Sequence, residues 1–249
     1  MRDVLTDVLN TVRLHSCIYC QSEINKSNWA LRFSATSCSV FHIVAEGTCL
    51  AEVEGSATPI CLSAGDLLVL PGGYNHMIAD RPGAALCADI HLEQETDAEC
   101  MLMRWGDNGP RTTLVCGTFA VDRDNGGDLL RLLPPILTFD AQSVTRYGIK
   151  PSIDALIEEA RAVHPGRETI LTRLADVLFV KVVRAWLASP DNQTIGWLRA
   201  LNDPHLSAAV SQIHAAPDQD WTVESLAGEA YMSRSAFAAR FAEIIGETP

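Results

Sequence analysis

Residues 218–249 read DQDWTVESLAGEAYMSRSAFAARFAEIIGETP, and this stretch predicts two short helices joined by a tight turn. Thr222 and Ser233 carry hydroxyl side chains of the kind that cap helices, and each stands directly before one predicted helix, 223–228 or 234–245. Two helices joined this closely form either an ordinary helical hairpin or a helix-turn-helix. In the second case the later helix enters the major groove of DNA.

Apolar side chains in this stretch fall on faces that can pack the two helices together; they are Leu226, Ala230, Met232, Phe237, Phe241 and Ile245. The opposite side then carries the residues that we expect to face DNA: Ser233, Arg234, Ser235, Ala239 and Arg240. In a helix-turn-helix the N-terminal end of the second helix contacts base edges. We therefore expect Arg234 and Ser235 to lie near bases and Arg240 to reach a phosphate.

Residues 221–249 closely resemble the first helix-turn-helix of AraC/XylS-type transcription regulators. Upstream, FHIVAEG (41–47), LSAGDLLVLPGGYNH (62–76) and LVCGTFAVD (114–122), followed by LLPPIL (132–137), resemble the cupin-type sensor domain that one branch of this family carries. The resemblance implies a DNA-binding transcription regulator without enzymatic activity. It also implies that the sensor domain responds to an effector and that the chains pair as a homodimer. Because the N-terminal stretch lacks the apolar core of a signal peptide, we expect a cytoplasmic location by default.

Members of this family carry two helix-turn-helix units, and the resemblance covers the first of them, up to Pro249. Arg234 and Arg240 are the only lysine or arginine residues after Ala215, and several carboxylates share that stretch: Asp218, Asp220, Glu224, Glu229, Glu243 and Glu247. Neutralisation of phosphates supplies much of the affinity of proteins for DNA. We therefore expect residues 1–249 by themselves to bind DNA weakly.

Composition limits the class of protein. With 249 residues, 47% apolar and 20% charged, the chain is long enough for one large or two ordinary globular domains. No apolar run is long enough to span a membrane, and the N-terminal stretch is interrupted by charges, so we expect neither a membrane span nor a signal peptide. The net charge of −12 argues against a generic nucleic-acid binder but leaves room for a local DNA-binding surface.

The order of patterns along the chain predicts an α+β multidomain protein. Short apolar runs broken by turn residues fill 17–122 and are typical of an antiparallel sandwich or barrel. With the resemblance, we expect an N-terminal antiparallel β-barrel of the cupin or jelly-roll type, then an α-helical linker, then a helix-turn-helix. The expected domains are a cupin-like sensor over 1–127, a helical linker and dimerisation region over 128–202, and the first AraC-type unit over 203–249.

The most apolar predicted helix covers 168–187, ETILTRLADVLFVKVVRAWL. Its apolar surface is wider than one core face needs, so the helix is either buried within the domain or pairs with a second chain. The resemblance favours pairing, because these regulators commonly dimerise through the sensor domain or its adjoining helices.

Gly65, Pro71, Gly73 and His76 fit the pattern G-x5-P-x-G-x2-H, the second motif of cupins. The resemblance implies that the turn in this motif aims the imidazole of His76 into the barrel. It also implies a place opposite for His42, although metal-binding cupins usually have a further histidine where this chain has Val44.

His42 and His76 are therefore candidate ligands for a divalent metal such as zinc, or for a small molecule. Zinc and iron(II) sites normally use at least three protein ligands, so a third group such as Cys116 or His91 would have to join them. The alternative is that both histidines are hydrogen-bonded barrel residues. A cupin metalloenzyme acting on a small organic acid, of the dioxygenase or isomerase kind, is the competing function.

Eight cysteines lie in the N-terminal half of the chain. Cys17 and Cys20 form a lone C-x-x-C, and without a second such pair a zinc ribbon is disfavoured. The candidate redox thiols are Cys20, Cys87 and Cys116, and the alternative is that they are small packed side chains. We expect the effector to be a small molecule or an oxidant, with the small molecule slightly favoured because the second cupin motif is complete.

Overall fold

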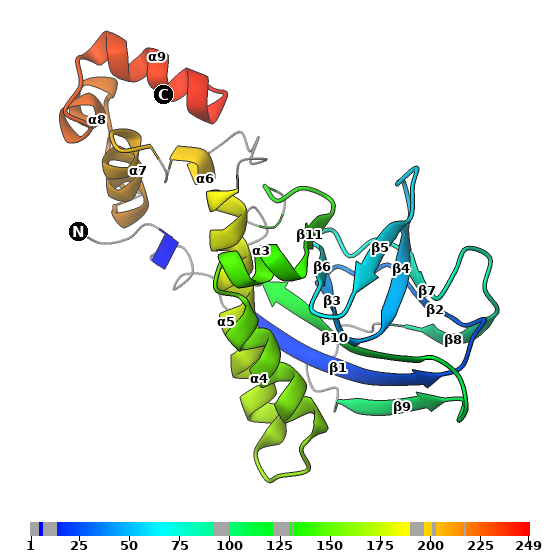
Figure 1. The fold of residues 1–249 in the computed structure, drawn as a ribbon. Helices are drawn as coiled ribbons and strands as arrows, with labels where there is room; N and C mark the ends of the chain where they lie inside the picture. Colours follow the sequence, from blue (N-terminus) through cyan, green and yellow to red (C-terminus); the bar gives the residue numbers. More distant parts are fainter. Residues whose placement is uncertain are drawn as a thin grey trace. The chain divides into compact units, whose positions relative to one another are not determined.

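The computed structural model describes residues 5–6, 14–91, 100–121, 130, 132–189, 197–200, 203–216 and 218–249. After a helical turn at Leu5 and Thr6, the strands precede the labelled helices, as predicted (Figure 1). The chain divides into two compact units. The first holds Leu14–Val121 and Pro134–Val183, and the second holds Arg184–Pro249 together with Met1–Arg13 and Asp122–Leu133.

Two β-sheets make up most of the first unit. Within the described ranges the strands are β1 (Leu14–Asn25), β2 (Ala30–Phe33), β3 (Ser39–Glu46), β4 (Thr48–Val53), β5 (Ile60–Ser63), β6 (Leu67–Leu70), β7 (His76–Ala79), β8 (Leu86–Ile90), β9 (Met101–Trp105), β10 (Arg111–Val121) and β11 (Leu137–Phe139). Six of them form a sheet in the order β11-β6-β3-β10-β1-β9, and five form a second sheet in the order β5-β4-β7-β2-β8.

The expectation of a closed antiparallel barrel was wrong on two points. The sheets remain separate, so each ends on its own edge strands. In addition, β9 pairs with β1 and β8 pairs with β2 in parallel, so both sheets are mixed. Strand spacing in a sequence reports where strands begin and end. It carries no information on which edges meet, and closure depends on that.

The core of this unit lies between the two sheets, where alternate side chains of each strand point inward. An irregularity in β1 changes this alternation, because Ile18 pairs with Gly117 and Cys20 pairs with Cys116, which leaves Tyr19 unpaired. Tyr19 and Cys20 are consequently both members of the buried core, although they are neighbours in sequence. Such a β-bulge re-aims side chains locally.

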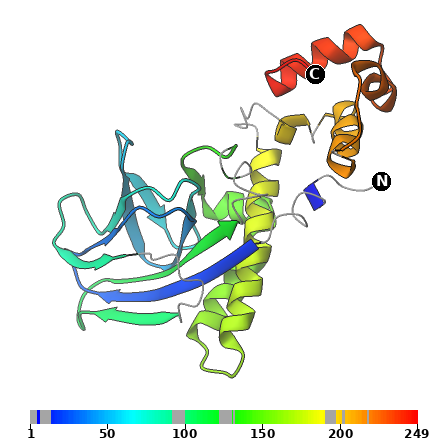
Figure 2. The ribbon, with the colours of Figure 1, turned by 180° about the vertical axis from the view of Figure 1, so that it is seen from behind.

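Helices cover the outer face of the six-stranded sheet. They are α3 (Ala141–Arg146), α4 (Lys150–Arg161) and α5 (Arg167–Ala188), and Figure 2 shows α4 and α5 side by side, crossing one end of β1 and β10. Phe119 of β10 contacts Phe179 of α5, with ring centroids 5.2 Å apart. The predicted helix over 168–187 is confirmed, and its buried face supports the interpretation as a core helix, whereas Ile170 and Val177 remain exposed.

The second unit contains α6 (Trp197–Ala200), α7 (Leu206–Ala215), α8 (Val223–Glu229) and α9 (Arg234–Ile245). The predicted starts of the last two helices are confirmed. The Thr222 hydroxyl accepts a hydrogen bond from the Ser225 N–H, and the Ser233 hydroxyl accepts one from the Ala236 N–H. None of the described helices is both long and apolar enough to cross a membrane.

Several elements were not predicted: β7, β9, β11, α3 and α6. All are short, and β9 is an edge strand with mostly exposed side chains, so none gives a clear period of two or 3.6. The boundary expected at 127 lies outside the described residues.

Gly73 allows the turn before His76, and we predict that Gly73→Ala destabilises the first unit by more than Gly55→Ala does. Both glycines have positive φ, which costs an alanine about 1–2 kcal/mol. At Gly73 a Cβ atom would also overlap the carbonyl oxygens of Thr36 and Cys38, whereas nothing lies near Gly55. Chemical denaturation of both variants measures the difference, and equal losses would show that the close approach does not matter.

Candidate functional site

The two histidines expected to face each other do so in the core. His42 comes from β3 and His76 from β7, so each sheet contributes one imidazole. Their Nε2 atoms are 2.7 Å apart, which is a hydrogen-bond distance. His42 is fully buried and His76 is 4% exposed. The ring of Phe33 stacks on that of His76, with centroids 4.8 Å apart and an angle of 5°.

Each histidine has a second partner at its other ring nitrogen. The Nδ1 atom of His42 lies 3.0 Å from the thiol sulfur of Cys116, which is its cross-strand neighbour on β10. The Nδ1 atom of His76 lies 2.7 Å from the carbonyl oxygen of Tyr74, in the turn before β7. The four groups therefore form one continuous chain, Cys116–His42–His76–Tyr74.

Burial keeps both imidazoles neutral. Desolvation lowers the pKa of His42 well below its usual value, and the neighbouring His76 lowers it further. Desolvation also lowers the pKa of His76 to about 4, although the Tyr74 carbonyl acts in the opposite direction. Burial raises the pKa of the Cys116 thiol, and the neighbouring Cys20 adds to that increase. At neutral pH the chain is accordingly a set of uncharged groups.

These residues do not fit a metal site. The Cys116 sulfur lies at Nδ1 of His42, and His76 lies at Nε2, on the other side of the same ring. Cys116 and His76 therefore cannot bind one metal ion together with His42. His91, the other candidate third ligand, is exposed and contacts Ser34 through its Nδ1 atom. Among the described residues, no group of three or more His, Cys, Asp or Glu side chains is placed to hold a metal ion.

The three candidate redox thiols do not gather in one place. Cys20 is buried and pairs with Cys116 across β1 and β10. Cys87 is half-buried on β8 and lies 3.6 Å from the Nζ atom of Lys26. The structure therefore joins Cys20 to the histidine cluster and gives Cys87 a different environment.

Sequence reasoning missed Tyr19 as a member of this cluster. Its hydroxyl is buried and has no hydrogen-bond partner among the described residues. The β-bulge in β1 places it there, and no residue pattern in the sequence marks that bulge. Burial, followed by the neighbouring Cys116 thiol, raises the pKa of Tyr19, so the hydroxyl keeps its proton.

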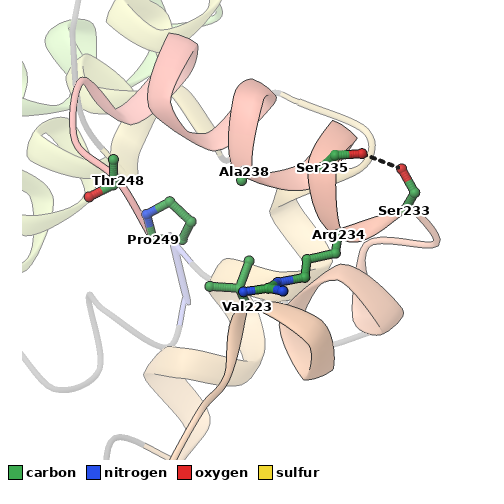
Figure 3. Close-up of a pocket in the computed structure, with 7 residues that line it drawn as sticks. All are labelled: Val223, Ser233, Arg234, Ser235, Ala238, Thr248 and Pro249. Atoms are coloured by element: carbon green, nitrogen blue, oxygen red, sulfur yellow. Dashed lines mark hydrogen bonds between the residues drawn. The ribbon is translucent and has the colours of Figure 1, made fainter.

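The expected DNA-facing residues lie at the exposed start of α9. Ser233, Arg234, Ser235 and Ala239 are all exposed. A hollow of about 700 Å³ lies beside this end of the helix. Figure 3 shows that Arg234 and Val223 both lie on its lining. That hollow is lined by Val223, Ser233, Arg234, Ser235, Ala238, Thr248 and Pro249.

Arg240 has a different environment. Its Nε and Nη2 atoms lie 3.0 and 2.8 Å from Oδ2 of Asp203, and its Nη1 atom lies 3.2 Å from Glu243. Asp203 is buried and also accepts hydrogen bonds from the N–H groups of His205 and Leu206, at the start of α7. Burial opposes ionisation of Asp203, but these N–H groups and the guanidinium outweigh it and lower its pKa. Arg240 therefore joins α9 to α7.

Comparison with known proteins gives a consistent result over the whole chain. A family model described as Cupin matches residues 3–188. The HTH-type transcriptional regulator AlkR of Acinetobacter baylyi is 29% identical, over 99% of this chain and 81% of its own length. A putative AraC-like transcription regulator of Streptomyces lividans is 31% identical, over 99% of this chain and 80% of its own length. The crystal structure of ToxT from Vibrio cholerae, at 10% identity, covers 96% of this chain and 76% of its own, with a TM-score of 0.35 that is too low to support an inference.

We predict that the stability of the first unit falls as the pH is lowered from 6.5 towards 4. Unfolded histidines titrate near pH 6.5, whereas His76 stays neutral to about pH 4 in the fold, so the unfolded state binds more protons in this window. Each buried histidine contributes up to about 1.4 kcal/mol per pH unit. Denaturant unfolding should give a shallower pH slope for His76→Gln. An unchanged slope in this variant would contradict the prediction, and exposed His164→Gln is the matched control.

We also predict that Arg240→Ala destabilises the second unit by more than Arg234→Ala does, because it leaves the buried Asp203 carboxylate without its cation. Arg234→Ala removes an exposed arginine from the same helix and should change stability by less than about 0.5 kcal/mol. Thermal unfolding of the two variants is the measurement. Equal effects would show that the Arg240–Asp203 pair has no structural role.

Proposed function

Because the chain belongs to the AraC-like transcription regulators that carry a cupin-type domain, we propose that it is an effector-responsive regulator with sensing and DNA contact in separate units. Its likeness to regulators over 99% of its length supports DNA binding. The observation in the structure that carries the proposal is the exposed start of α9, where Ser233, Arg234 and Ser235 are all exposed.

In this proposal α8 and α9 act as a helix-turn-helix. Ser233, Arg234 and Ser235 stand at the N-terminal end of α9, which is the end that contacts base edges in this motif. Ala239 extends the same exposed surface. Arg240 is the weakest candidate for DNA contact, because its guanidinium already faces the carboxylates of Asp203 and Glu243.

Sensing belongs to the first unit, where the His42–His76–Cys116 cluster places hydrogen-bonded polar groups among the apolar side chains of the core. An effector that alters this cluster and is bound better in one conformation than in another would shift the balance between them. A small molecule and an oxidant both remain candidates. We further propose that chains pair through α5, where Ile170 and Val177 are exposed.

A cupin metalloenzyme is the alternative. The relatives named above are transcription regulators, and they favour the regulator over the enzyme. The described histidines also lack a third ligand beside them. We therefore propose no catalytic residue for this chain.

We predict that Arg234→Ala weakens DNA binding at least tenfold and lowers the slope of log affinity against log salt by about 1, since one phosphate or base-edge cation is lost. Fluorescence anisotropy on a duplex selected from a random pool by the protein itself measures both. Residues 1–249 should bind it no more tightly than micromolar at physiological salt. Arg173→Ala, an exposed arginine of the first unit, is the matched control and should bind like wild type. Equal affinity of Arg234→Ala and wild type would remove α9 as the contact surface.

A further inference from the structure

The direction of every hydrogen bond in the buried chain is fixed by the group at its end. A carbonyl oxygen only accepts, so Nδ1 of His76 carries a proton and donates to Tyr74. Neutral His76 then has a free lone pair at Nε2, which must accept from Nε2–H of His42. Neutral His42 is left with a lone pair at Nδ1, and the Cys116 thiol is the donor that reaches it. The chain therefore runs from thiol to carbonyl in one direction only.

This arrangement gives the Cys116 thiol an imidazole as a hydrogen-bonded base. Cys49 is a fair comparison, because it lies in the same buried core and burial raises the pKa of its thiol to about 12. No imidazole is hydrogen-bonded to Cys49 within the described residues. Cys116 also lies close to the unpartnered hydroxyl of Tyr19, a donor that is free to stabilise a negative sulfur.

We propose that Cys116 is the reacting thiol of the sensor, that His42 takes its proton, and that a small neutral peroxide is the oxidant. The proposal rests on the regulatory function proposed above and specifies its effector class. It also means that the two histidines at the cupin positions hold a proton relay in place of a metal.

Oxidation of the Cys116 thiol by hydrogen peroxide proceeds in two steps. The sulfur of Cys116 attacks one oxygen of hydrogen peroxide, so an S–O bond forms and the O–O bond breaks. The thiol proton passes to Nδ1 of His42 while the Nε2–H proton of His42 passes to Nε2 of His76, which becomes a transient imidazolium. The leaving hydroxide then takes a proton from Nδ1 of His42 and forms water, His76 returns its proton to Nε2 of His42, and both imidazoles are neutral again. The sulfur is oxidised by two electrons to a sulfenic acid. The thiol of Cys20 then attacks that sulfur, an S–S bond forms, and a second water leaves.

Cys20 is placed for this second step. It is the Cα partner of Cys116 in the antiparallel pair of β1 and β10. Such partners have Cα atoms roughly 4.5–5.5 Å apart, which lies within the range that a disulfide spans. Cys87 is not paired with Cys116 in either sheet, because it lies on β8 of the other sheet.

The transient positive charge has a suitable position at His76. Its Nδ1–H already donates to the Tyr74 carbonyl, and its ring lies flat against Phe33. The titratable groups that face Cys116 are His42, Tyr19, Cys20, Cys49 and Cys100. None of these groups is a carboxylate or an amine. No ion pair with one of them therefore competes with proton transfer from Cys116 to His42 and His76.

The test follows the oxidation of each cysteine over time. The full chain is exposed to hydrogen peroxide, quenched in acid, unfolded with an alkylating agent, and mapped by mass spectrometry without reduction. We expect the free thiols of Cys116 and Cys20 to disappear at the same rate as one Cys20–Cys116 disulfide forms, and before the Cys49 thiol is oxidised. Because the base is internal, the rate should change less than about twofold between pH 6 and pH 8.

Two variants separate the relay from simple exposure. In His42→Gln we expect the rate at Cys116 to fall at least tenfold and to rise about tenfold per pH unit, since the thiolate must then form by loss of a proton to solvent. Tyr19→Phe removes only an unpaired hydroxyl and so does not endanger the fold; it should slow Cys116 severalfold. Cys87→Ser is the matched control and should leave the rate at Cys116 unchanged.

Three results would overturn the proposal: first oxidation at Cys87 or Cys61 with Cys116 intact, an unchanged rate in both His42→Gln and Tyr19→Phe, or a stoichiometric metal bound by the purified protein and lost in His42→Gln. DNA binding of the reduced protein is measured in parallel. If Cys116 does not react but the protein binds DNA normally, the relay is rejected and the regulatory function stands. If Cys116 reacts but the protein binds no DNA, the regulatory function is rejected.

Discussion

The hydrogen bond between the imidazoles of His42 and His76 is the interaction on which the first unit depends. It joins one sheet to the other through polar groups in the middle of an apolar core. A buried polar group without a partner costs roughly 1–3 kcal/mol, so each nitrogen of the pair has to be satisfied. Cys116 and Tyr74 supply the outer partners, and the positions of β3, β7 and β10 are thereby linked.

The second unit follows the same rule with charged groups. Asp203 is buried, and it is held by two backbone N–H groups and by the guanidinium of Arg240. The guanidinium of Arg240 stays partly exposed, but the carboxylates of Asp203 and Glu243 already neutralise its charge. The surface that remains for DNA is therefore small, and among the described residues of α9 Arg234 is its one arginine without a carboxylate partner.

The features that could be predicted from the sequence were those that depend on residues close together in the chain. Thr222 and Ser233 marked the starts of α8 and α9 because a cap acts within one turn of a helix. The second cupin motif placed His76 inward because its turn lies directly before the histidine. Contacts between distant residues were not predictable. Asp203 and Arg240 are far apart in the chain, and the order of strands that brings Cys116 beside His42 is a property of the sheet.

The extra residue in β1 has a consequence for how such proteins diverge. Tyr19 is an insertion in the ladder, and the strand keeps its pairing on both sides of it. Loss of a single codon at this position would remove the hydroxyl and straighten the strand, while Ile18 and Cys20 kept their partners. Loss of a codon farther along β1, where no extra residue can absorb it, would turn part of the strand to the opposite face. The bulge is thus a point at which a lineage can gain or discard the tyrosine in one genetic step without changing the fold.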